Sequence, residues 1–185
     1  MNLIDHPSEF KQGVRVVMRV LRSKDGGLGK PDHHATKIIT TNEQEWKAAV
    51  VKLAQEASGE ERIYSCVDAR DWNKAIHEFK RRQLDADLYD DKAKLVFYLD
   101  LKNRFIGSLM TPSSRKTKYF LFDCDSLEDY ERCFASEDVR NNMIHQYSTK
   151  NGYHVITKPF NPSLAAKAGI NPDNVKKNAL MLVGY

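Results

Sequence analysis

Apolar residues along this chain recur at two spacings, one typical of strands and one typical of helices. Short runs rich in β-branched and aromatic residues predict strands. Those runs are Val14–Leu21, Lys37–Thr41, Arg62–Val67, Tyr119–Phe122, Met143–Thr149, Tyr153–Lys158 and Ala179–Val183. Apolar residues three and four positions apart predict helices between them. The helices are Asn42–Ala57 with Asn42 as its cap, one after Asp71, Ala93–Met110 ended by Pro112, Leu127–Phe134, Glu137–Asn141 and Ser163–Ala168.

This alternation of strands and helices predicts an α/β fold with a mixed sheet flanked by helices. A length of 185 residues favours one domain with a substantial core. The apolar content of 41% and the charged content of 29% are ordinary for a globular protein. A net charge of +4 is compatible with a polyanionic ligand but does not require one.

Hydropathy and cysteine content indicate where the protein is expected to be located. No apolar run approaches the roughly 20 residues that cross a bilayer, so we expect no membrane partner. The three cysteines, Cys66, Cys124 and Cys133, are odd in number and lack metal-type spacing. They predict reduced thiols in a cytoplasmic protein.

The run Tyr119–Phe122 leads into two acids, Asp123 and Asp125, separated by one residue. Strand side chains alternate faces, so both carboxylates should project from one face and Cys124 from the other. A divalent cation would relieve their mutual repulsion, and Mg²⁺ prefers carboxylate oxygens. The alternative is structural: Asp123 ends the strand, and Asp125 with Ser126 caps the following helix.

Basic side chains lie on both sides of the acid pair in the sequence. The segment before it carries Arg115, Lys116 and Lys118, which suits either a phosphate-metal site or a solvated loop. After it, two strand-like runs meet across Lys150-Asn151-Gly152, a sequence typical of a hairpin turn. His154 therefore follows a tight turn, and with Lys150 it is a candidate for phosphate binding.

Taken in chain order, these features resemble the catalytic core of the archaeo-eukaryotic primase superfamily, the small primases and primase-polymerases. The family's first motif, a hydrophobic run ending in two acids, corresponds to Phe120–Asp125. Its second motif, a small residue, any residue and a histidine, corresponds to Gly152-Tyr153-His154. Its third motif is an acid between apolar residues, and this chain carries Asn178 there. The similarity covers roughly 62–185, so we expect one primase-like domain over 1–185 with an N-terminal α/β part at 1–61.

The resemblance implies an RRM-like catalytic core that performs metal-dependent nucleotidyl transfer on nucleic acid. It implies Asp123, Asp125 and His154 as catalytic residues, Mg²⁺ or Mn²⁺ as cofactor, and Asn178 as the residue that completes the metal site. His154, Lys150, Arg115, Lys116 and Lys118 would bind nucleotide phosphates or template. The implied partners are nucleoside triphosphates, single-stranded or primed nucleic acid, and a helicase or other replication proteins.

Two alternatives stay open at this point. An amide oxygen can ligate a metal but brings no charge, so Asn178 is also compatible with a non-catalytic nucleotide-binding or nucleic-acid-binding protein on the same fold. The same acids and histidine would also serve a metal-dependent nuclease or phosphodiesterase.

Overall fold

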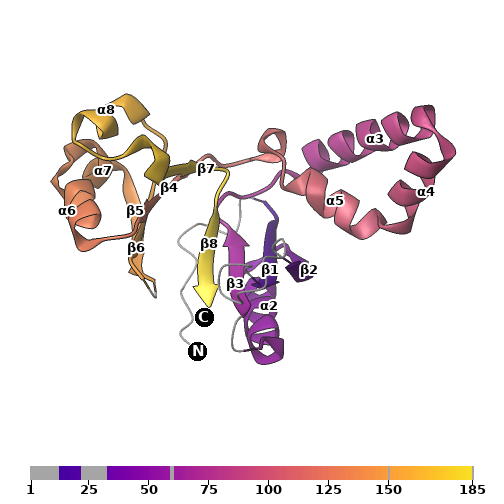
Figure 1. The fold of residues 1–185 in the computed structure, drawn as a ribbon, viewed down its shortest axis with the longest axis horizontal. Coiled ribbons are helices and arrows are strands. Elements are labelled where there is room, and N and C mark those ends of the chain that lie inside the picture. Colours follow the sequence, from indigo (N-terminus) through magenta and orange to yellow (C-terminus); the bar gives the residue numbers. More distant parts are fainter. Residues whose placement is uncertain (1–12, 22–32, 59–60, 150, 185) are drawn as a thin grey trace.

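The chain forms two four-stranded sheets that face each other, with helices on their outer sides and at one edge (Figure 1). The structure is a computed structural model and describes residues 13–21, 33–58, 61–149 and 151–184. Strands pair only in the antiparallel sense among the described residues. The α/β class is therefore confirmed, but the expected single mixed sheet is replaced by two antiparallel ones.

The first sheet has the order β2-β1-β3-β8. Its strands are β1 (Arg15–Leu21), β2 (His33–Thr40), β3 (Glu61–Cys66) and β8 (Leu180–Gly184). It thus combines strands from the expected N-terminal part with the strand nearest the C-terminus. The expected boundary after residue 61 also falls inside β3, so the sheet does not follow that division.

The second sheet has the order β5-β6-β4-β7. Its strands are β4 (Phe120–Cys124), β5 (Met143–Ser148), β6 (Tyr153–Thr157) and β7 (Val175–Lys177). The predicted hairpin is β5–β6, joined by residues 149–152 and closed by a hydrogen bond from the Thr149 amide to the Gly152 carbonyl oxygen (2.7 Å). Lys150, the central basic residue of this turn, lies outside the described residues.

One apolar core fills the space between the two sheets. It joins Val17 and Ile63 of the first sheet to Leu121 and Ile156 of the second, and Trp46 of α2 (Glu43–Glu56) completes it. Asn42 caps α2 by accepting a hydrogen bond from the Glu45 amide (2.9 Å), as the sequence predicts. Because the sheets share this core, their relative position is fixed by apolar burial.

The outer faces of the two sheets are covered by different helices. The second sheet carries α6 (Leu127–Ala135), α7 (Glu137–Asn142) and α8 (Pro162–Lys167), which pack on its outer face. The first sheet receives Ala75 from α3 (Trp72–Tyr89), and Ile106 and Leu109 from α5 (Leu101–Leu109). Two 3-10 turns, η2 (Pro112–Ser114) and η3 (Pro172–Asn174), complete the elements.

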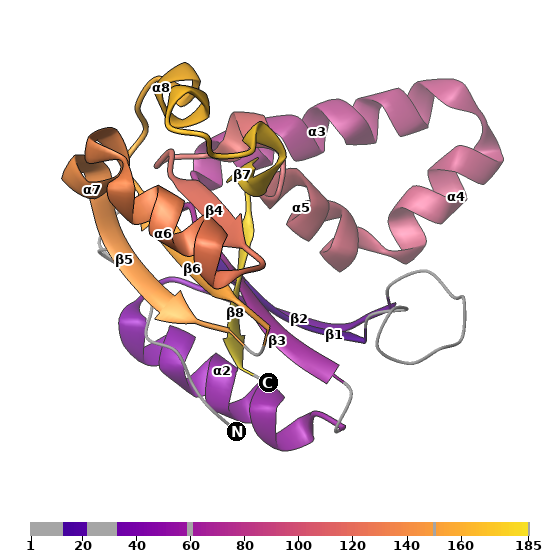
Figure 2. The ribbon, with the colours of Figure 1, turned by 60° about the vertical axis from the view of Figure 1, so that its left-hand side comes forward.

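Helices α3, α4 (Asp91–Leu99) and α5 form an arm that projects away from the sheets (Figures 1 and 2). The single long helix expected over 93–110 is wrong, because the chain leaves helical geometry at Asp100 (φ −134°, ψ 40°). The break lets Phe97 pack against Phe79 of α3 while α5 reaches the first sheet. Apolar residues at helical spacing fitted one helix equally well, so the sequence pattern concealed the break.

Candidate functional site

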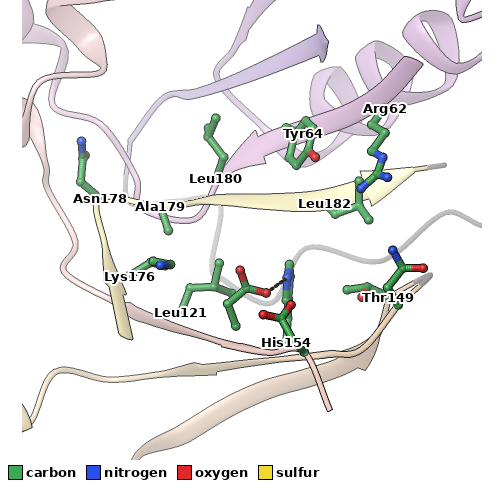
Figure 3. A pocket seen from close by; sticks show the side chains of 13 residues that line it. Arg62, Tyr64, Leu121, Thr149, His154, Lys176, Asn178, Ala179, Leu180 and Leu182 are labelled. Atoms are coloured by element: carbon green, nitrogen blue, oxygen red, sulfur yellow. Dashed lines mark hydrogen bonds and ion pairs between the residues drawn. The ribbon is translucent and has the colours of Figure 1, made fainter. Parts of the chain in front are cut away.

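A pocket of about 640 Å³ lies between the two sheets, beside the predicted acid pair (Figure 3). Both sheets and the β5–β6 turn contribute to its walls. The residues that line it are Arg62, Tyr64, Leu121, Asp123, Asp125, Thr149, Asn151, His154, Lys176, Asn178, Ala179, Leu180 and Leu182. Its floor combines apolar side chains with acids and bases, a composition that suits a charged organic ligand.

The alternation of β4 places both acids in this pocket. Phe120, Phe122 and Cys124 point into the outer core, whereas Asp123 and Asp125 line the pocket. The prediction that both carboxylates share a face opposite Cys124 is confirmed.

Ser126, rather than Asp125, caps the next helix. Its hydroxyl accepts a hydrogen bond from the Asp129 amide at 3.1 Å. The Asp125 residue is exposed at the pocket. The capping interpretation therefore holds for the serine alone.

The antiparallel pairing of β4 with β6 brings His154 directly opposite Asp123. Its Nε2 atom lies 3.1 Å from Oδ1 of Asp123, and its side chain is only 12% exposed. The strand pairing thus joins the first and second sequence motifs at one point of the sheet.

Tyr147 lies opposite His154 on the other side, and its hydroxyl is 2.6 Å from Nδ1 of the imidazole. Burial and, secondarily, the charge of Asp123 raise the pKa of Tyr147, so its hydroxyl keeps its proton. The Asp123 carboxylate accepts a hydrogen bond when Nε2 carries a proton, and the direction of the bond between the Tyr147 hydroxyl and Nδ1 depends on the imidazole tautomer. Tyr147 was not among the predicted site residues, although pairing across a connection at 149–152 matches position 147 with 154.

Gly152 allows the turn to touch the end of β4. A Cβ atom at this position would lie 2.1 Å from the carbonyl oxygen of Cys124 and 3.2 Å from Cα of Asp125. No side chain fits in that space, so the small residue of the second motif is required by backbone contact with the acid pair.

Arg115 does not reach the pocket. Its Nε atom lies 2.6 Å from Oδ2 of Asp68, whose side chain is fully buried, and an Nη2 group donates to the Tyr119 carbonyl oxygen. The Tyr119 amide in turn donates to Oδ1 of Asp68 (2.8 Å). Arg115 thus anchors the segment before β4, and the expectation that it binds phosphate is not met.

Lys116 and Lys118 are exposed and do not line the pocket. The structure therefore separates the basic segment from the acid pair that it precedes in sequence. It places Arg62 of β3 and Lys176 of β7 in the pocket instead, on either side of the histidine (Figure 3). Neither was predicted, because a basic residue within a strand carries no local signal for a site.

Asn178 lies at the pocket edge but its amide is already engaged. Its Oδ1 atom accepts a hydrogen bond from the fully buried Arg70 (2.5 Å), and its Nδ2 group donates to the Met110 carbonyl oxygen (3.0 Å). Figure 3 shows this side chain pointing away from His154. The oxygen of Asn178 therefore serves the guanidinium, and its role in completing the metal site stays a prediction. Its φ of +58° is one that asparagine tolerates better than most residues.

The donor set fits one type of cation better than others. Among the described residues, no three His, Cys, Asp or Glu side chains form a cluster that could hold a metal ion. Two pocket carboxylates suit Mg²⁺ or Mn²⁺, since Mg²⁺ keeps several waters and uses one or two carboxylates together with substrate phosphates. They do not suit a structural Zn²⁺, which needs four protein ligands.

Comparisons with known proteins do not assign this chain to a family. No protein-family model, curated protein or solved structure matches this chain. The resemblance to primases thus stays a prediction that depends on the motifs. Within the described part of the chain, no helix has the length and apolar character to span a membrane.

Proposed function

We propose that this protein is a metal-dependent nucleotidyltransferase of the primase or primase-polymerase type. The observation that carries the proposal is the meeting of Asp123, Asp125 and His154 in one pocket between two sheets. The motifs that supply them lie about 30 residues apart, as the register pair Asp123 and His154 shows. Their convergence is what a shared site requires.

Asp123 and Asp125 would hold one Mg²⁺ or Mn²⁺ ion, with water and nucleotide phosphate oxygens completing its coordination. Such an ion lowers the pKa of an attacking hydroxyl and stabilises charge on the phosphate. The chain itself contributes the two carboxylates, an imidazole N–H group fixed by Tyr147, and two basic side chains, Arg62 and Lys176, for phosphate oxygens.

Tyr64 and Leu182 form part of the same pocket from the first sheet. An aromatic ring and an aliphatic side chain offer a surface on which a nucleobase can stack. The pocket therefore offers apolar surface for a base beside charged side chains for phosphates, which supports a nucleotide over a simple inorganic anion.

A second candidate is a nucleotide-binding or nucleic-acid-binding protein without catalysis. The observation that favours it is the engagement of Asn178 with Arg70, which leaves the third motif without a metal ligand. Two-metal transfer needs enough ligands to hold both ions. The two carboxylates fit one ion, so stoichiometry separates the candidates: two bound Mn²⁺ ions in the presence of nucleotide favour the enzyme.

The decisive experiment is a labelled primer–template incubated with Mn²⁺ and nucleoside triphosphates. Extension supports the transferase, shortening supports a nuclease or phosphodiesterase, and neither product with retained nucleotide binding supports the second candidate. Asp123→Asn should abolish extension and weaken Mn²⁺ binding measured by calorimetry. Asp173→Asn is the matched control, because Asp173 is an exposed acid of η3 outside the pocket. Equal extension by both variants would refute the proposed role of the acid pair.

A further inference from the structure

Two of the three cysteines are in contact on the side of β4 that faces away from the pocket. The sulfur atoms of Cys124 and Cys133 are 3.6 Å apart, and the residues are 2% and 1% exposed. Cys124 belongs to β4 and Cys133 to α6, and the apolar core around them includes Phe122 and Val155. Neither thiol takes part in the proposed reaction, so their proximity calls for a separate explanation.

Buried thiols often act only as small apolar groups. Here, however, the two sulfurs are in contact across β4 and α6, at 3.6 Å. Each thiol therefore has a neighbour that can resolve an oxidised intermediate on the other.

We propose that Cys124 and Cys133 form a modification site, a dithiol that hydroperoxides oxidise to a disulfide. One of the two sulfurs attacks the terminal peroxide oxygen as a thiolate, the O–O bond breaks, and an alcohol or water leaves with a sulfenic acid on that cysteine. The sulfur of the other cysteine then attacks the oxidised sulfur, the S–O bond breaks, and the oxygen leaves as water with the thiol proton. Two thiols lose two electrons and two protons, and the peroxide is reduced.

The geometry requires a modest movement. A disulfide bond is about 2.05 Å long, so the sulfurs must approach by about 1.5 Å. Cys133 lies on α6, a short helix that begins at Leu127, close after the end of β4. The loop closed by the bond contains Asp125, so oxidation would also restrict one proposed metal ligand. That last consequence rests on the proposed function, whereas the chemical modification does not.

The test reads thiols and not activity. Native protein is treated with hydrogen peroxide, quenched, denatured, alkylated and digested, and its cysteine peptides are identified by mass spectrometry. We expect a reductant-sensitive cross-link between the peptides of Cys124 and Cys133. Cys66, which is 0% exposed in the first sheet, should stay reduced during the treatment and should therefore be found alkylated. The thiols of Cys124 and Cys133 should be lost together and faster than the Cys66 thiol, because each of them has a resolving partner at contact distance.

Two controls make the outcome decisive. Cys66→Ser should leave the cross-link unchanged, and Cys133→Ala, which keeps an apolar side chain in the core, should abolish it and slow the loss of the Cys124 thiol to the rate of Cys66. In denaturant the preference for the 124–133 pair over Cys66 should disappear. Equal oxidation of all three cysteines in the native protein, or no cross-link at a peroxide dose that oxidises Cys66, would overturn the proposal.

Discussion

The contact between the hairpin turn and the acid pair can be tested by adding one methyl group at Gly152. In Gly152→Ala the new Cβ atom would lie 2.1 Å from the Cys124 carbonyl oxygen, whereas real Cβ atoms do not approach closer than 3.0 Å. The turn or the end of β4 must therefore move by about 0.9 Å, the difference of these two distances. Both clashing groups are backbone, so no side-chain rotation relieves the contact.

Overpacking of this kind costs about 1–3 kcal/mol of the free energy of unfolding. For a chain of this size, the melting temperature should fall by about 2–12 °C, at about 2–4 °C per kcal/mol. Calorimetry or circular dichroism gives this value directly. The new Cβ atom would also lie 3.2 Å from Cα of Asp125. Because the backbone of this proposed metal ligand must shift, Mn²⁺ affinity should fall as well.

Gly107→Ala is the matched control. Gly107 lies inside α5, and a Cβ atom there would meet only the flexible Nη1 group of Arg82 at 3.5 Å. Alanine inside a helix stabilises by about 0.5–1 kcal/mol relative to glycine, so the melting temperature should rise. If Gly152→Ala melts at the wild-type temperature, or shifts upward like the control, the reasoning about the turn is refuted.

Three further predictions follow from buried and capped groups. Asp68→Asn should lower the free energy of unfolding by about 3–5 kcal/mol, because it breaks the buried ion pair with Arg115. Glu128→Gln removes an exposed ion pair on α6 and should cost at most about 0.5 kcal/mol. Urea unfolding of the two variants compares these losses. Asn178→Asp should leave Mn²⁺ affinity unchanged by calorimetric titration, since its oxygen faces Arg70. Hydrogen bonds from a backbone amide and a hydroxyl at the start of α2 lower the pKa of Glu45. The unfolded state therefore takes up the proton first, so stability should fall as the pH drops below about 4.5, and Glu45→Gln should weaken this dependence in melting curves.

Local patterns were sufficient to predict the centre of the candidate site. Alternation along a strand placed Asp123 and Asp125 on one face, and a hairpin sequence placed His154 near the next strand. Both signals span a few residues, whereas the contact between Asp123 and His154 also needs the pairing of β4 with β6. The capped start of α2 at Asn42 was predictable for the same reason.

The remaining site residues depend on partners far away in sequence. Arg115 is held by Asp68, and Asn178 by Arg70, through pairs that no local spacing indicates. Arg70 is fully buried, and arginine side chains are almost never fully buried unless they are paired. Basic residues before the acids therefore suggested a phosphate site, whereas the fold uses one of them as an internal anchor.

The position of β8 has a consequence for synthesis on the ribosome. β3 pairs with β1 on one side and with β8 on the other, although β8 is made long after β3. Until β8 leaves the exit tunnel, one edge of β3 has no partner strand, and the shared core lacks Met181. The first sheet can therefore begin to form early but cannot be completed before translation of this chain has passed Gly184. A nascent chain stopped before residue 180 should expose that edge to chaperones and to proteases, however well its first strands have paired.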